Sequence, residues 1–146
     1  MSSILNEFNI PQLDYTSGGA DFSNKLRFPS FSRTIPSDRY TMKAIAEACD
    51  YFIWERVIVI TTNDEYGASL LAAIQAAMDE KTILVERVYK LDALDSGSVR
   101  GALTSIREQD ISRIVIPLLP ATVTDAAVFF GLVSDLQMTT SYFLAE

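Results

Sequence analysis

The sequence of 146 residues has no histidine and a single cysteine. Without histidine, the chain lacks the most common general base and zinc ligand, and it cannot form a Ser-His or Cys-His catalytic pair. One cysteine excludes an internal disulfide and leaves the redox compartment open. Because Cys49 falls on the apolar face of a predicted helix, we expect its side chain to be buried in the core.

Basic residues are also few, since Lys and Arg number 12 against 19 Asp and Glu, for a net charge of −7. The bases are scattered singly along the chain, whereas nucleic-acid-binding proteins cluster them to neutralise phosphates. We therefore expect no binding to nucleic acid and no direct contact of this segment with an anionic membrane surface. No apolar run approaches the roughly 20 residues of a membrane span, and the N-terminal residues do not resemble a signal peptide.

The apolar runs that are present alternate with segments of helical periodicity. Three segments are predicted to be strands, and the first is a short, continuous β-branched run of the kind that helices cover on both faces. They are "RVIVITT" at 56–62, "TILVERVY" at 82–89 and "RIVIPLL" at 113–119. Shorter extended pieces are predicted at 9–15, 30–35 and 141–145.

Helices are predicted between the strands, each with one apolar face at three- and four-residue spacing. Ser37 or Asp38 is a suitable N-cap for the first helix, and Ser96 or Ser98 for the third. The side chains that we expect to be buried on the first helix are Met42, Ile45, Ala46, Cys49, Phe52 and Ile53. Those expected on the last helix are Val123, Ala127, Phe130 and Val133 or Leu136.

This alternation predicts an α/β fold, with a mainly parallel doubly wound sheet and helices on both of its faces. In such sheets ligands bind beyond the carboxyl ends of the strands, close to helix N-termini. Candidate sites therefore fall in "TSGGAD" at 16–21, "PSD" at 36–38 and "NDEYGAS" at 63–69, with further loops at 92–98 and 118–124.

Each of the first three loops has a structural and a functional interpretation. The "TSGGAD" loop lacks a phosphate-binding pattern, so it is either a turn with positive φ at glycine or a loop that holds a carboxylate or ammonium group through Thr16 and Ser17. Asp38 is either an N-cap or a ligand contact. Tyr66 either covers the core or faces a ligand, and Asp64 is expected to be a solvated loop acid. No residue pattern indicates a metal or a cofactor.

The segments "IPQLDYTSGGADFSNKLRFPSFSRTIPSD", "WERVIVI" and "EYGAS" resemble, in this order and spacing, the type I periplasmic-binding-protein fold. The likeness is greatest to the receptor ligand-binding regions of class C G-protein-coupled receptors and atrial-natriuretic-type receptors, and it runs over nearly the whole chain. In that family two α/β lobes close on a ligand like a hinged trap. The resemblance implies that residues 1–30 are the end of lobe 1 and the interlobe crossover, and that residues 31–146 are lobe 2, incomplete at its C-terminus.

The same resemblance assigns candidate ligand contacts. It implies that Asp38 and Tyr66 lie on lobe 2 and face the cleft, where the carboxylate and the aromatic ring contact a ligand ammonium group. Thr16 matches a position that supplies a hydroxyl to the α-amino group of the ligand, and Ser17 adjoins it. Gly18 stands where a second hydroxyl residue is expected, which is a departure from the family pattern.

The function implied by the resemblance is a non-catalytic, small-molecule-binding region of a cell-surface receptor, with an amino acid as one ligand class and lobe closure as the mechanism. We expect it on the extracellular or periplasmic face of a membrane, without a cofactor. The expected partners are the missing first lobe of the same protein and a second receptor subunit. The alternatives are a soluble solute-binding protein of a transport system, a truncated fragment without independent activity, and an enzyme, which the absence of histidine disfavours.

Overall fold

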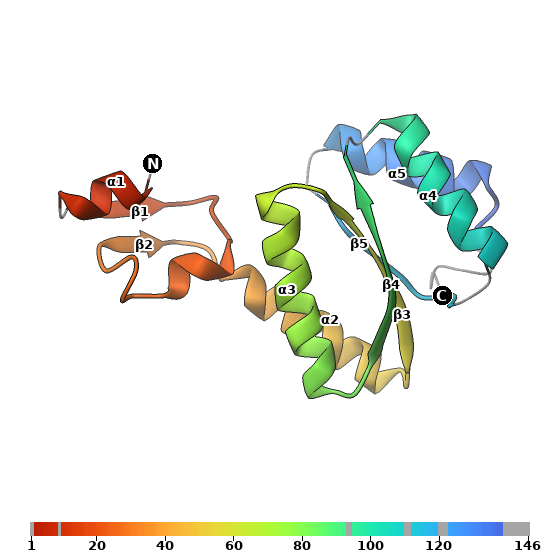
Figure 1. Ribbon diagram of the computed structural model, residues 1–146, viewed down its shortest axis with the longest axis horizontal. Helices are drawn as coiled ribbons and strands as arrows, with labels where there is room; N and C mark the ends of the chain where they lie inside the picture. Colours follow the sequence, from red (N-terminus) through yellow and green to blue (C-terminus); the bar gives the residue numbers. More distant parts are fainter. Residues whose placement is uncertain (1, 9, 93–94, 110–111, 120–122, 139–146) are drawn as a thin grey trace.

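The computed structural model of the chain describes residues 2–8, 10–92, 95–109, 112–119 and 123–138 (Figure 1). The helices are α1 (Ser2–Glu7), the short 3-10 helix η1 (Ala20–Ser23), α2 (Asp38–Tyr51), α3 (Glu65–Glu80), α4 (Ser96–Gln109) and α5 (Val123–Asp135). The strands are β1 (Gln12–Asp14), β2 (Phe31–Arg33), β3 (Arg56–Thr62), β4 (Leu84–Leu91) and β5 (Val115–Leu118). The extended piece that we expected at 141–145 lies outside the described residues.

The larger sheet has three strands in the order β4-β3-β5, and both of its strand pairs are parallel. Helices α2 and α3 cover one face of this sheet, and α4 and α5 cover the other (Figure 1). The predicted α/β class, with parallel strands flanked by helices, is therefore confirmed.

The central strand β3 connects two separate hydrophobic cores. Val57 and Val59 pack into the core beneath α2 and α3, whereas Ile58 and Ile60 pack into the core beneath α4 and α5. All four side chains are at most 1% exposed. Because successive side chains of a strand point to opposite faces, a strand covered on both sides must be apolar at every position, and this explains the continuous run in the sequence.

Helix α2 buries only part of the predicted face. Met42, Ala46 and Cys49 are buried, so the expectation for Cys49 is confirmed. Phe52 and Ile53 were expected to be buried, but they are 56% and 81% exposed. The helix ends at Tyr51, and Ile53 adopts a left-handed φ of 59°, which turns the chain away from the core before these side chains can reach it.

Helix α5 buries only part of the predicted face, with Val133 inside as expected, and the side chain of Val123 lies outside what the structure describes. Phe129, Leu132 and Val133 are buried, whereas Ala127 and Phe130 are exposed. The sequence "AAVFFGLV" at 126–133 is apolar almost all round, so its periodicity does not distinguish one face from another. Packing against α4 and β3 determines which face of α5 is buried.

The first part of the chain forms a smaller unit beside the main sheet (Figure 1). Strands β1 and β2 pair in parallel, with Gln12 opposite Phe31, in a sheet of their own. The ring of Phe22 in η1 stacks on the ring of Phe31 with centroids 4.6 Å apart. Residues 31–33 thus pair with the preceding segment and not with the three-stranded sheet.

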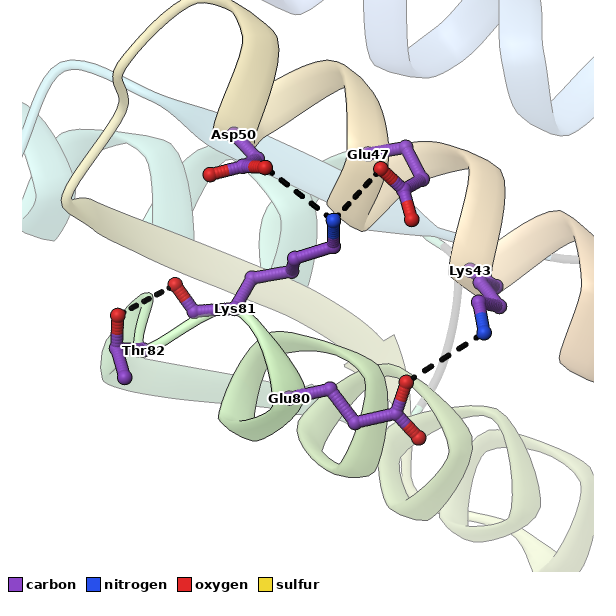
Figure 2. A network of polar contacts seen from close by, with 6 residues as sticks. All are labelled: Lys43, Glu47, Asp50, Glu80, Lys81 and Thr82. Carbon is purple, nitrogen blue, oxygen red and sulfur yellow. Dashed lines mark hydrogen bonds and ion pairs between the residues drawn. The ribbon is translucent and has the colours of Figure 1, made fainter.

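Ion pairs join α2 to α3 at the end of α3 (Figure 2). The Nζ of Lys81 lies 2.7 Å from Glu47 and 3.2 Å from Asp50, and the Nζ of Lys43 lies 3.6 Å from Glu80. Together with the buried apolar face, these contacts hold the two helices side by side. The relative position of their N-termini is therefore set by packing along their whole length.

The start of α3 packs directly on the end of β3. An ideal Cβ at residue 67 would lie 2.1 Å from the carbonyl oxygen of Thr62, so only glycine fits there. The hydroxyl of Thr61 also donates a hydrogen bond to the carbonyl oxygen of Gly67, at 3.3 Å. Gly67 thereby allows the helix to begin immediately after the strand.

Replacing Gly67 by Ala is expected to lower the free energy of unfolding by about 1–3 kcal/mol, because the new methyl group overlaps backbone that cannot move away. Urea denaturation measures this change.

Gly101→Ala in α4 is the matched control, since an added Cβ there meets nothing within 4 Å. That substitution is expected to raise the free energy of unfolding by about 0.5–1 kcal/mol. Equal effects of the two substitutions would contradict this role of Gly67.

Candidate ligand-binding site

Tyr66 lies in the first turn of α3, just beyond the carboxyl end of β3. Its side chain is 42% exposed, so it stands at this edge of the sheet and not inside the core. The helix starts here because Asp64 is its N-cap and accepts a hydrogen bond from the backbone N–H of Gly67 at 2.7 Å. Asp64 also accepts from the hydroxyl of Thr62 at 2.7 Å. It is exposed, as we expected of a solvated acid, but it is also the N-cap of α3, a role that the sequence reasoning did not assign to it.

Asp38 is the first residue of α2, and the neighbouring Ser37 is the N-cap. The Ser37 side chain accepts the hydrogen bond from the backbone N–H of Arg39, at 3.4 Å. Of the two capping residues that we considered, the structure selects Ser37, and the carboxylate of Asp38 is not needed for the cap. Its Oδ2 atom is buried and has no hydrogen-bond partner among the described residues.

The electrostatic environment of Asp38 is unfavourable to its charge. Burial raises the pKa of Asp38, and the positive charge of Arg33 opposes the rise only in part. A buried carboxylate oxygen without a donor is costly, so it calls for a partner from outside the chain, such as a ligand, an ion or an ordered water.

Asp38 and Tyr66 lie close enough to influence each other. Burial raises the pKa of Tyr66, and the negative charges of Asp38 and Asp64 raise it further. Although they are far apart in the sequence, Tyr66 and Asp38 thus lie near enough at the same edge of the sheet for the charge of one to act on the other. The structure brings these two predicted site residues together.

Thr16 and Ser17 fold around Asp14 instead. The backbone N–H groups of both residues donate to Asp14 Oδ1 at 2.7 Å, and the Ser17 hydroxyl donates to Asp14 Oδ2 at 3.0 Å. These backbone hydrogen bonds are the main reason why the pKa of Asp14 is lowered. With their hydrogens directed to Asp14, the two hydroxyl oxygens remain available as acceptors. Their side-chain hydrogen bonds lead to Asp14 and not to Asp38 or Tyr66.

The glycines of this loop are not there for positive φ, which no described glycine adopts. The turn that we expected from "TSGGAD" was therefore the wrong explanation for Gly18. An ideal Cβ at residue 18 would lie 2.1 Å from Asp38 Oδ1 and 2.6 Å from its carboxyl carbon. The carbonyl oxygen of Gly18 also accepts a hydrogen bond from the backbone N–H of Asp38 at 2.8 Å. Gly18 is needed because the Asp38 carboxylate fills the space of a side chain.

Arg33 is a residue of this site that sequence reasoning missed. Its Nη1 donates to the carbonyl oxygens of Ser17, Gly18 and Gly19 at 3.3, 3.0 and 2.9 Å. The guanidinium group therefore holds the loop, and its positive charge acts on Asp38. Its position within the segment "SFSRTIP" was the only hint, because a single arginine in an extended piece does not reveal which carbonyl groups it will reach.

This arrangement suits a cationic group better than an anionic one. It offers an aromatic ring, a carboxylate oxygen without a donor, and hydroxyl oxygens that can accept hydrogen bonds. The described residues contain no group of three or more side chains that could hold a metal ion. In the same part of the chain, no helix is long and apolar enough to cross a membrane.

The parallel α/β fold, with candidate contacts at the carboxyl edge of its sheet, is suited to ligand binding. The chain matches the receptor family ligand binding region over residues 1–145, and it belongs to that family. Over 86 residues it is 35% identical to the extracellular calcium-sensing receptors of Homo sapiens, Sus scrofa and Mus musculus. The aligned segment covers 59% of this chain but only 8% of those receptors. The family identified from the sequence motifs is therefore confirmed.

Replacing Asp38 by Asn is expected to lower the pKa of Tyr66, because a negative charge beside the phenol is removed. The pKa should stay above its ordinary value of 10.0, since burial is the larger cause of the rise. A pH titration of the Tyr66 ring carbons by NMR measures the shift. Glu108→Gln, on the opposite side of the sheet, is the control and should not move the Tyr66 midpoint. An unchanged midpoint in Asp38→Asn would show that the two side chains are not neighbours.

The same Asp38→Asn substitution is expected to stabilise the chain at neutral pH. The raised pKa means that ionised Asp38 destabilises the folded state, and this penalty disappears as the pH falls below the ordinary value of 3.8. Thermal unfolding should therefore show a higher melting temperature for Asp38→Asn than for the parent at pH 7, and no difference between the two at pH 3. Glu55→Gln, which removes an exposed carboxylate, is the control. A variant that is less stable than the parent at pH 7 would contradict the prediction.

Proposed function

We propose that this chain forms part of the non-catalytic ligand-binding region of an extracellular receptor, and that it recognises a small molecule with an ammonium group, such as an amino acid. The observation that carries the proposal is the buried Oδ2 of Asp38, which has no donor among the described residues. It belongs to a carboxylate at the carboxyl edge of the sheet whose charge acts on Tyr66. Ligands bind at this edge in parallel α/β sheets.

An ammonium group would supply what the site lacks. It would donate a charge-assisted hydrogen bond to Asp38 Oδ2, and such bonds are stronger than bonds between neutral groups. The ring of Tyr66 would attract the same charge by about 0.5–2 kcal/mol, depending on how far water is excluded. An anionic ligand would instead meet the negative charge of Asp38 with no compensating donor.

Thr16 and Ser17 would contribute from the other side of the crossover. Both hydroxyls donate to Asp14, so each oxygen can accept a hydrogen bond from the ligand. Gly18 adds no hydroxyl of its own. In its place the carboxylate of Asp38 occupies the corresponding volume, so the subsite is more negative than one lined by hydroxyl groups alone.

Lobe closure is the mechanism that this arrangement supports. Thr16 and Ser17 precede β2 in the smaller unit, whereas Asp38 and Tyr66 begin helices of the larger one. A ligand that contacts both sets stabilises only the state in which they are close together, and so shifts the population toward that state. The remainder of the first lobe, and a second receptor subunit, are the further partners that we propose.

Tyr66→Ala is expected to weaken the binding of an amino acid by about 2- to 30-fold, which corresponds to the loss of the cation–π attraction. The measurement is isothermal titration of the receptor ectodomain that carries this chain and its first lobe, with a panel of amino acids. Tyr51→Ala is the matched control, because Tyr51 is 80% exposed at the far end of α2. It should leave the affinity unchanged.

Two results would refute the proposal. One is that no amino acid or related amine in the panel binds the ectodomain. The other is that a ligand binds equally well to the parent, to Tyr66→Ala and to Asp38→Asn.

A further inference from the structure

A cavity lies between η1, the first turns of α2 and one face of α3. Its volume is about 540 Å³, which is within the range of small-molecule sites in proteins. None of the four residues of the proposed ligand site lines it. Because η1 belongs to the smaller unit and the two helices to the larger one, anything bound in this cavity would contact both units.

The floor of the cavity is apolar and is made of small side chains. Ala72, Ala73, Ala76 and Ala77 line it from α3, and their three- and four-residue spacing places them on one face of the helix. Side chains of this size leave the space above the helix open. Tyr40 lines the wall formed by α2, where its side chain is 70% exposed, and it adds aromatic surface.

Hydrogen-bond donors without acceptors line the same cavity. Ser37 is only 3% exposed, and its side-chain oxygen accepts from the backbone N–H of Arg39 at 3.4 Å. Its hydroxyl group donates to none of the described residues, and the same holds for the hydroxyl of Ser69 and the guanidinium group of Arg39. A buried hydroxyl group without an acceptor calls for a partner from outside the chain. All three residues would be satisfied by an acceptor, and none of them by a further donor.

The charges around the cavity favour an acceptor with a single negative charge. The Nζ of Lys43 lies 3.6 Å from Glu80, so these two lining residues neutralise each other (Figure 2). Arg39 has no acidic partner in the described part of the chain, and it lies in the first turn of α2, where the helix dipole adds positive potential. On the opposite wall, Asp21 has no cationic partner among the described residues and would repel a second negative charge.

We propose that this cavity is a binding site for small monocarboxylates with an apolar body, separate from the proposed ligand site. The carboxylate accepts hydrogen bonds from Ser37, Ser69 and Arg39, and the bond from Arg39 is strengthened by its charge. The apolar body packs on the alanine face of α3, which removes apolar surface from water. This binding uses no residue of the proposed ligand site, so it does not depend on the proposed function.

The test is an amide NMR titration of the chain with phenylacetate, and with neutral phenylacetamide as the matched compound. Phenylacetate should shift the amide signals of Asp21, Tyr40 and Ala72, one from each wall, in a saturable way with a dissociation constant of about 1 mM or less. Phenylacetamide should bind about tenfold or more weakly, because it lacks the charge that Arg39 recognises. The absence of saturable shifts, shifts confined to one wall, or equal affinity for the two compounds would overturn the proposal.

Two pairs of exposed residues locate the binding. Arg39→Gln should weaken the binding of phenylacetate by about tenfold or more, whereas Arg87→Gln on β4, outside the cavity, should not change it. Ala72→Leu fills the floor and should abolish saturable binding, whereas Ala68→Leu, on the same helix but outside the cavity, should preserve it. Unchanged affinity in Arg39→Gln or in Ala72→Leu would overturn the proposal. If no amino acid binds the ectodomain, the proposed function fails, and these titrations still decide whether the cavity binds carboxylates.

Discussion

The site depends on the direction of β3 relative to the helices that pack against it. Helix α2 precedes β3 and runs back across the sheet, whereas α3 follows β3, so both helices begin at the carboxyl edge of the sheet. The two-sided burial of β3 holds this geometry, because Val57 and Val59 are covered by the same two helices whose N-termini carry Asp38 and Tyr66. Moving either helix would expose apolar surface, so the two side chains stay together without any bond between them.

Around this edge nearly every polar group is satisfied by the protein itself. Asp64 caps α3, and Asp14 accepts hydrogen bonds from Thr16 and Ser17. Arg33 donates to three carbonyl oxygens. Asp38 is the exception, with a buried oxygen atom that has no donor in the described part of the chain. Asp38 thus destabilises the folded state, whereas the polar groups around it are hydrogen-bonded. Natural proteins break such local rules at functional sites. The proposed function rests on this difference between Asp38 and its hydrogen-bonded neighbours.

Some local predictions were wrong because adjacent residues were equally able to play the same role. Both Ser37 and Asp38 can cap a helix, and the structure uses Ser37, while Asp95 and not Ser96 or Ser98 accepts the first hydrogen bond of α4. The face of α5 could not be derived either, since an apolar segment gives no preferred direction. In each case the local chemistry allows several answers, and contacts with distant segments decide among them.

The sequence by itself determined the parallel α/β class, the burial of Cys49 and the family, because apolar periodicity and ordered motifs are local properties of the chain. It also indicated Asp38 and Tyr66, since both stand at predicted helix starts. Only the tertiary structure revealed why residue 18 is glycine and what Arg33 does. Their roles come from a carboxylate and three carbonyl groups that the fold brings within reach. No local pattern records such a contact, because the partners meet only after β1, β2 and α2 have packed.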